Sequence, residues 1–314
     1  MEIQLIQSHL KTSVIQSILQ ILLKYDEKSY LFFLFLVFKM TKLRLSLCQM
    51  NVIDDKQENI KKAQSMIRES IKKNADFIVL PEMFNCPYSN EKFIEYAEEE
   101  TGSFTLSSIS KLACENKVYI LAGSIPEKEN DRLYNTSYLF DRNGEIIAKH
   151  RKVHLFDIDV KDKITFKESD VLTAGDEFTI AKTDFGKIGI GICYDVRFPE
   201  LARIMVENGA IILFYPGAFN MTTGPAHWEL LFRSRALDNQ AYCVGVAPAL
   251  NKDASYHSYG HSIITGPWGN VIAQGDEREQ IIISEIDLDE IKKIREELPL
   301  LKNKREDLYE VKRK

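Results

Sequence analysis

Several things are scarce in this sequence, and each scarcity excludes a class of protein. Only five cysteines occur among 314 residues, with no CxxC pair and no Cys/His cluster at zinc-ligand spacing, which excludes a disulfide framework and a zinc site. Basic residues are not in excess, because the formal net charge is −5. The longest strongly apolar run, residues 30–38, covers nine residues, whereas a membrane-spanning helix needs about 20. We therefore expect no nucleic-acid partner, no stable membrane insertion and a reducing compartment, cytoplasmic or alternatively mitochondrial.

The composition that is present favours an ordinary soluble globular protein. Hydrophobic residues make up 45% of the chain and charged residues 28%, which is enough apolar material to bury one large core. No internal repeat or low-complexity linker divides residues 41–314, so we expect one domain there. Residues 1–40 are expected to form an N-terminal extension outside that domain, with a targeting segment as the alternative.

Short apolar runs alternate with longer amphipathic stretches along residues 41–314, which is typical of sheets covered by helices. We expect strands at 44–49, 77–80, 118–122, 136–140, 146–149, 187–192, 211–215, 242–247, 262–265 and 281–285, and helices at 54–73, 103–115, 200–208 and 226–239. Short polar turns join several strands, so hairpins should be mixed with crossovers. The pattern predicts a layered α/β sandwich rather than a purely parallel sheet.

One cysteine stands where an apolar strand ends. Residues 187–200 read KIGIGICYDVRFPE, with Cys193 between the predicted strand and the helix that follows. Backbone N–H groups and the positive end of a helix favour a thiolate at such a junction and can stabilise an oxyanion. The alternative is a packed core cysteine, because free cysteines are usually buried and inert. The segment alone identifies a candidate nucleophile.

A carboxylate is presented in the same way. Residues 77–82 read FIVLPE, in which four apolar residues and a stiff proline deliver Glu82 to the end of a buried strand. Strand ends are where the sites of α/β proteins gather. The alternative is a solvated loop glutamate.

A basic cluster follows another predicted strand. Residues 149–156 read KHRKVHLF and centre on Lys152, with His150 and His154 on either side. Taken alone, such a cluster is typical of a solvated loop. The two histidines flank an apolar stretch, where a structural role is more common than a catalytic one, and we assign neither a chemical role.

Together these segments resemble the nitrilase superfamily, whose members present one Glu, one Lys and one Cys at strand ends. The strings LPE at 80–82, HRKVH at 150–154 and GICYD at 191–195 occur in the superfamily's order and at its usual separations, and the similarity runs over about residues 41–310. The resemblance implies a four-layer αββα sandwich, an α/β fold, with residues 41–314 as a carbon-nitrogen hydrolase catalytic domain.

The resemblance also implies a role for each residue. Glu82 would be the general base for the nucleophile Cys193, and would later activate water. Lys152 and the backbone N–H of Tyr194 would stabilise the tetrahedral oxyanion. A second glutamate of the superfamily supports the lysine, and Glu168 matches its place. Neither acylation nor hydrolysis of the thioester requires a metal or an organic cofactor.

The residues after the nucleophile favour an amide over a nitrile as substrate. Nitrile-cleaving members carry Trp and Glu there, whereas this chain has Tyr194 and Asp195. Residues 154–160, 163–169 and 215–229 are similar to the omega-amidase branch of the superfamily. That branch hydrolyses the keto-acid amides 2-oxoglutaramate and 2-oxosuccinamate to 2-oxoglutarate and oxaloacetate, with release of ammonia.

Such a substrate keeps an anionic end, which requires a donor. Arg197, one helical turn past the nucleophile, can offer a bidentate guanidinium to a carboxylate. The predicted substrate contacts are Arg197, Thr223, Tyr88 and Phe219. For Arg197 the alternative is a structural ion pair with Asp195 or Glu200, and for Thr223 and Phe219 it is loop packing.

Two other functions and one assembly state also follow from the resemblance. A sister branch, the deaminated-glutathione amidases, shares the triad and the string GPAHWE at 224–229 but accepts a longer, peptide-like amide. A catalytically silent binding protein on the same fold is the alternative from another class. Members of the superfamily commonly pair, so we expect a homodimer.

Overall fold

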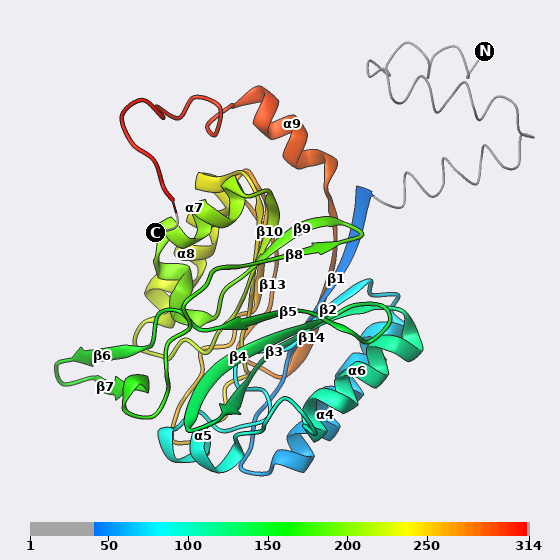
Figure 1. Cartoon of the computed structure of the whole chain (residues 1–314), viewed down its shortest axis with the longest axis vertical. Coiled ribbons are helices and arrows are strands. Elements are labelled where there is room, and N and C mark those ends of the chain that lie inside the picture. The colour runs from blue at the N-terminus through cyan, green and yellow to red at the C-terminus, as the bar shows by residue number, and fades with distance from the viewer. Residues whose placement is uncertain (1–40, 313–314) are drawn as a thin grey trace, which may run out of the picture. The chain divides into compact units, whose positions relative to one another are not determined.

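The computed structural model describes residues 41–312, and the predicted extension, residues 1–40, lies outside them. Two six-stranded sheets form its centre (Figure 1). The first has the order β14-β1-β2-β3-β4-β5, with bounds Gln280–Asp287, Lys42–Gln49, Phe77–Val79, Tyr119–Glu129, Arg132–Phe140 and Ile146–Arg151. The second has the order β13-β12-β11-β10-β9-β8, with bounds Val271–Gln274, Ile263–Thr265, Tyr242–Val246, Ala210–Pro216, Gly186–Ile190 and Thr179–Thr183.

The two sheets face each other and helices cover their outer faces. Alternate residues of each strand point to opposite sides of a sheet. Leu45 and Leu47 of β1 therefore enter the core between the sheets. Ser46 and Cys48 point to the other side, where their side chains contact Ser70 of the helix that covers it. Between the sheets, the Phe77 ring stacks on Phe214 with ring centroids 4.7 Å apart. The four-layer αββα sandwich predicted from the sequence is confirmed.

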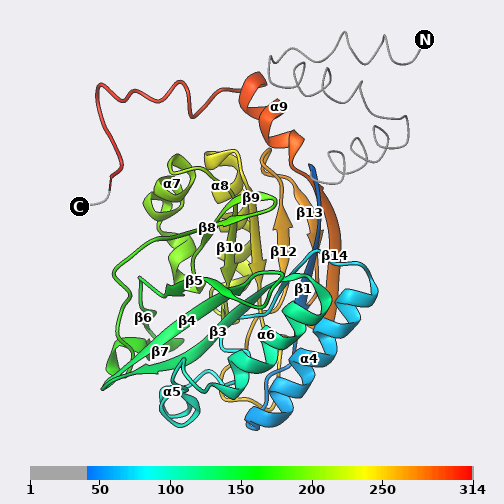
Figure 2. The ribbon, with the colours of Figure 1, turned by 45° about the vertical axis from the view of Figure 1, so that its right-hand side comes forward.

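Helices α4 (Lys56–Lys72) and α6 (Phe104–Asn116) lie on the outer face of the first sheet, and α7 (Pro199–Glu207) and α8 (Gly224–Asn239) on that of the second (Figure 2). Helix α4 shows how the sequence specifies this. Asp55 caps its N-terminus by accepting a hydrogen bond from the Glu58 N–H, and residues at helical spacing, Ile60, Ala63 and Ile67 among them, are buried.

The strand directions bring several loops to one edge of the sandwich. Strands β1, β2 and β3 run parallel, as do β9, β10 and β11. Strand β5 follows two antiparallel pairings, so it runs in the same direction as β3. The carboxyl ends of these strands therefore deliver the segments that follow them, including Glu82 after β2, Lys152 after β5 and Cys193 after β9, to one region.

Most predicted elements are present, and the differences concern their ends and some short elements. The strand predicted at 187–192 ends at Ile190, and Cys193 begins a 3₁₀ turn, η2 (Cys193–Arg197), before α7. The prediction omitted β8, β13, the hairpin of β6 (Asp157–Val160) and β7 (Ile164–Lys167), the turn η1 (Glu168–Asp170), and helices α5 (Asn90–Tyr96) and α9 (Asp289–Glu297). No helix within residues 41–312 is long and apolar enough to cross a membrane.

Candidate active site

Cys193 sits in a strained turn. Its φ angle is +48°, in the left-handed region that costs a residue with a side chain about 1–3 kcal/mol. Two glycines make room for the turn: a Cβ at Gly217 would lie 3.1 Å from the Cys193 Cα, and one at Gly191 would press on the Tyr215 ring. Cys193 is buried, with 4% of the residue exposed.

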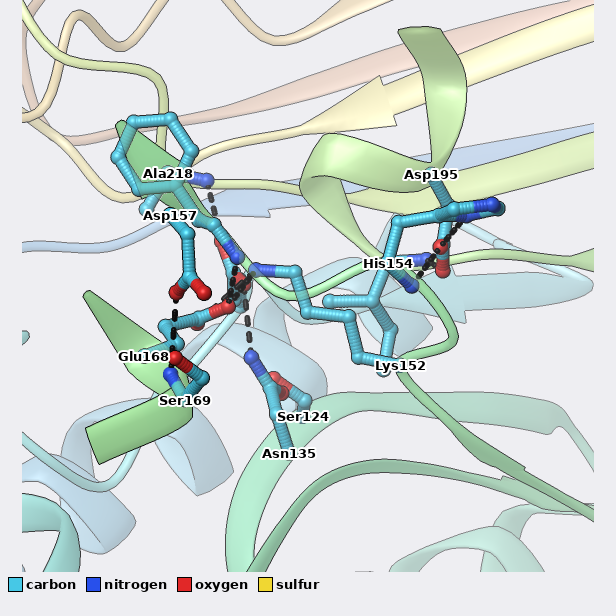
Figure 3. A network of polar contacts seen from close by, with 12 residues as sticks. Ser124, Asn135, Lys152, His154, Asp157, Glu168, Ser169, Asp195 and Ala218 are labelled. Atoms are coloured by element: carbon cyan, nitrogen blue, oxygen red, sulfur yellow. Dashed lines mark hydrogen bonds and ion pairs between the residues drawn. The ribbon is translucent and has the colours of Figure 1, made fainter. Parts of the chain in front are cut away.

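A buried cluster of charges surrounds Lys152. Its Nζ lies 3.0 Å from Glu82 Oε1 and 2.9 Å from Glu168 Oε1, and all three side chains have no exposed surface. Figure 3 shows the Lys152 side chain reaching toward Glu168. An ion group removed from water is tolerated only when its members are paired and hydrogen-bonded. The resemblance predicted these side chains as one group, and the fold brings them together.

Neutral donors satisfy the remaining hydrogen-bonding capacity of the Glu82 and Glu168 carboxylates. Glu82 accepts from Asn135 Nδ2 at 2.8 Å through Oε1 and from the Ala218 N–H at 2.7 Å through Oε2. Glu168 accepts from the Phe156 N–H at 2.7 Å and from the Tyr88 hydroxyl at 2.8 Å. The donors come from segments that are far apart in the sequence, so each carboxylate is fixed in direction as well as in position.

The electrostatics of the cluster suit proton transfer. Burial raises the pKa of Glu82 above its ordinary value, an effect that Lys152 opposes and Glu168 reinforces. A base with a raised pKa accepts a proton more readily near neutral pH. For Lys152, burial favours the neutral amine, but Glu168 and Glu82 outweigh it and hold the lysine pKa well above 10.5. Lys152 is therefore a permanent positive charge at neutral pH.

The Cys193 thiol is close enough to the Glu82 carboxylate to be influenced by it, and it rests as a neutral thiol. Burial raises its pKa well above 9.0, the nearby Glu82 carboxylate raises it further, and Lys152 opposes both. A buried thiol of this kind becomes nucleophilic when an adjacent base removes its proton during attack. Glu82 is the carboxylate in place to do so.

Arg197 stands beside this cluster without a carboxylate of its own. Its Nη1 lies 3.1 Å from His227 Nδ1, and its guanidinium lies over the Phe219 ring at 4.5 Å. The Nε atom is buried and has no hydrogen-bond partner. Burial lowers the Arg197 pKa. Within residues 41–312, Arg197 forms no ion pair with Asp195 or Glu200. The alternative considered from the sequence, a structural ion pair for Arg197, is therefore not observed.

Aromatic rings enclose the remaining side of the cluster. Tyr88 stacks on Tyr256 with centroids 4.6 Å apart, and Phe166 of β7 lies 5.5 Å from Tyr88. Burial raises the pKa of Tyr88 well above 10.0, so its hydroxyl remains a donor. A cavity of about 480 Å³ reaches this point, and Glu82, Tyr88, Ala218 and Tyr256 are among its lining residues.

The comparisons with known proteins agree with this arrangement. The family model for carbon-nitrogen hydrolases matches residues 44–296. The chain belongs to the carbon-nitrogen hydrolase family. The match covers both sheets, apart from the first two residues of β1, and it includes the whole cluster.

Relatives of this carbon-nitrogen hydrolase place it within the nitrilase superfamily. Omega-amidase NIT2 of Xenopus tropicalis is 49% identical over 275 residues, which cover 88% of this chain and 99% of that protein. The chloroplastic omega-amidase of Arabidopsis thaliana is 51% identical over 276 residues, 87% of this chain and 75% of that protein. Among solved structures, Saccharomyces cerevisiae Nit3, a member of branch 10 of the nitrilase superfamily, matches with a TM-score of 0.78 at 41% identity over 84% of this chain and 97% of that one.

Not every predicted residue of this carbon-nitrogen hydrolase contacts the cluster. Thr223 lies at the start of α8, where its hydroxyl donates to Asn220 Oδ1 at 3.3 Å, and its contact with substrate stays a prediction. Phe219 packs beneath Arg197. Among residues 41–312, no group of three or more His, Cys, Asp and Glu side chains is arranged to hold a metal ion.

Sequence reasoning missed three residues of the site. They are Asn135, Tyr256 and His227. Asn135 lies inside β4, where an isolated polar residue gives no local signal, and Tyr256 lies in an irregular loop. His227 stood within the quoted string GPAHWE, and its position on α8, facing Arg197, was the missing information.

Proposed function

We propose that this chain is an omega-amidase, which hydrolyses the terminal amide of 2-oxoglutaramate, and of 2-oxosuccinamate, through a thioester on Cys193. Two lines of support meet here. Relatives named omega-amidase are 48–51% identical to this chain over 87–88% of its length. The observation that carries the substrate class is Arg197, a half-buried cation beside the nucleophile with no carboxylate partner among residues 41–312.

The carboxylate of the keto acid binds Arg197. A guanidinium whose Nε is unpaired can offer a bidentate pair of donors to a carboxylate. The Phe219 ring beneath the guanidinium holds it flat, and His227 fixes one of its nitrogens. With the anionic end bound there, the terminal amide of a short substrate reaches the thiol of Cys193.

Acylation follows from the geometry of the charges. Glu82 takes the thiol proton as the sulfur attacks the amide carbon, and the carbonyl oxygen becomes an oxyanion. Lys152 and the Tyr194 N–H stabilise that oxyanion, while Glu168 holds the Lys152 ammonium in place. The intermediate collapses when Glu82 returns the proton to the departing nitrogen, which releases ammonia and leaves the thioester.

Deacylation uses the same base a second time. Glu82 takes a proton from a water molecule, the hydroxide attacks the thioester carbon, and Lys152 again stabilises the oxyanion. The C–S bond then breaks, the proton passes from Glu82 to the sulfur, and the product leaves as a carboxylic acid that ionises in water. The steps use water, the side chains of the cluster and the backbone N–H of Tyr194.

The test is ammonia release from 2-oxoglutaramate by purified protein, beside Cys193→Ala and a matched control, Cys114→Ala. Cys114 is a partly exposed cysteine of α6, on the outer face of the first sheet. We expect turnover by the parent and by Cys114→Ala, and none by Cys193→Ala. Preference for deaminated glutathione would move the chain to the sister branch, and folded protein that hydrolyses neither amide would refute the proposal.

A further inference from the structure

Behind the nucleophile lies a buried carboxylate that the mechanism above does not use. Asp195 has no exposed surface, and four donors saturate its two oxygens. Oδ1 accepts from the His154 N–H at 2.9 Å and from His154 Nδ1 at 2.8 Å. Oδ2 accepts from the Ile192 N–H at 2.9 Å and lies 3.1 Å from His150 Nε2. Figure 3 shows His154 against Asp195, beside the Lys152 cluster.

The donors come from two segments that must meet for catalysis. His150 and His154 stand two residues before and two residues after Lys152. Ile192 and Asp195 enclose Cys193, and the Ile192 N–H bond to Asp195 spans the strained residue. One carboxylate therefore ties the segment that carries the oxyanion-stabilising lysine to the turn that carries the nucleophile.

We propose that Asp195 is a positioning residue, which holds Cys193 in register with Lys152 through His150 and His154. The inference rests on the proposed function, because it gives Cys193 and Lys152 the roles assigned there. Asp195 touches neither substrate nor the reacting atoms, and it acts by fixing the distance and direction between the two groups.

The surroundings of the two histidines support a fixed frame. His150 Nδ1 lies 2.9 Å from Thr179 Oγ1 of β8, so the ring is held from both sides. The His154 ring stacks on Phe198, with centroids 3.5 Å apart and planes 8° from parallel. Burial alone would raise the pKa of Asp195, but the hydrogen bonds from His150 and His154 outweigh it and keep the carboxylate ionised.

The experiment compares Asp195→Asn with a matched control, Asp184→Asn. Asparagine keeps the shape of the side chain but turns an amide N–H₂ toward donors, so at least one bond of the frame is lost. Asp184 is an exposed aspartate paired with Arg142 and has no contact with the site. The readout is the rate at which iodoacetamide alkylates Cys193, measured on the peptide that carries it. In this reaction Glu82 accepts the thiol proton, and the sulfur displaces iodide.

We expect Asp195→Asn to slow alkylation of Cys193 by about tenfold or more, because a displacement of the nucleophile by about 1 Å is enough for such a loss. Asp184→Asn should react like the parent. A folded Asp195→Asn that melts at a lower temperature but is alkylated within about twofold of the parent rate would overturn the proposal, since Asp195 would then stabilise the fold only.

A second variant decides the matter if Asp195→Asn does not fold. His154→Gln removes one side-chain bond at a residue that is 29% exposed and leaves the backbone bond to Asp195 in place. A fall of about threefold or more in alkylation rate supports the proposal, and a rate equal to that of the parent overturns it. The alkylation rate is measured with iodoacetamide and without 2-oxoglutaramate. The test of Asp195 can therefore succeed or fail independently of whether the chain hydrolyses that amide.

Discussion

At the scale of single residues, two buried carboxylates surround one lysine. The buried cluster of Glu82, Glu168 and Lys152 therefore holds more negative than positive groups. Lys152 neutralises only part of the charge of Glu82 and Glu168, and the neutral donors Asn135 and Tyr88 share the rest. Removing one member of such a group leaves the others unpaired in a low dielectric. The proposed mechanism gives the two glutamates separate duties, and Glu82 raises the pKa of the Cys193 thiol more than Glu168 does.

Glu168→Gln should lower kcat by about 10²- to 10³-fold with little change in KM, because it loosens the cation that stabilises the oxyanion. Steady-state ammonia release measures both constants. Glu115→Gln is the matched control, since Glu115 pairs with Lys111 on the exposed surface of α6 and such pairs contribute little. A rise in KM at constant kcat would instead place Glu168 in substrate binding.

Arg197→Met should raise KM for 2-oxoglutaramate by about 10- to 100-fold, the cost of losing a charge-assisted pair of hydrogen bonds. The value of kcat should change little, because Arg197 holds the end of the substrate that does not react. A neutral amide of similar length provides the comparison. Equal losses on the anionic and the neutral amide would mean that Arg197 shapes the site rather than binding the carboxylate.

At the scale of elements, close approach between two strands sets the position of Glu82. Strand β3 passes the end of β2 at Gly123, where a Cβ would overlap the carbonyl oxygens of Leu80 and Pro81. The Ser137 hydroxyl of β4 donates to the Gly123 carbonyl, and the Ser124 hydroxyl accepts from the Met83 N–H at 3.0 Å. The segment that delivers the base is thus packed against bare backbone.

Gly123→Ala should displace the segment 80–82, lower the free energy of unfolding by about 1–3 kcal/mol and reduce kcat. Urea unfolding and ammonia release measure the two effects. Gly102→Ala is the control, because its Cβ meets open space while its φ of +84° strains any other residue, so it should cost stability without affecting kcat. Full activity of folded Gly123→Ala would show that the base tolerates the displacement.

At the scale of the whole molecule, stability depends on the frame around Asp195. Hydrogen bonds hold the pKa of Asp195 in the folded chain well below 3.8, despite burial, which raises it. A carboxylate with a depressed pKa contributes stability that is fully present above its unfolded value and is lost as pH falls below it. This contribution is therefore complete at neutral pH.

The difference in melting temperature between the parent and Asp195→Asn should be largest near neutral pH and shrink as pH falls below about 4. In that range the unfolded parent binds a proton at Asp195 while the folded carboxylate stays ionised, so the stability that the charge contributes falls with pH. Thermal scans of both proteins across this range test it. A difference that stays constant into acid would mean that Asp195 stabilises the chain by packing rather than by charge.

The expected homodimer stays a prediction, which light scattering at several concentrations would test.

The sequence by itself determined which residue types stand at the strand ends. Glu82 and Cys193 each follow an apolar run, and the layers follow from local periodicity, which short segments carry without knowledge of their partners. The hairpin β6–β7 and the strands β8 and β13 were missed because they are short, carry a weak apolar alternation, and, apart from two residues of β8, are not buried.

Only the tertiary structure decided which of those side chains meet. Asp195 was weighed from the sequence as a partner of Arg197, two residues away, and the fold gives it to His150 and His154 instead, about 40 positions distant. Asn135 and Tyr256 likewise reach the cluster from a strand and a loop that are remote in sequence. Periodicity is a property of one segment, whereas a site at the edge of two facing sheets is made by many segments, and only packing brings their side chains together.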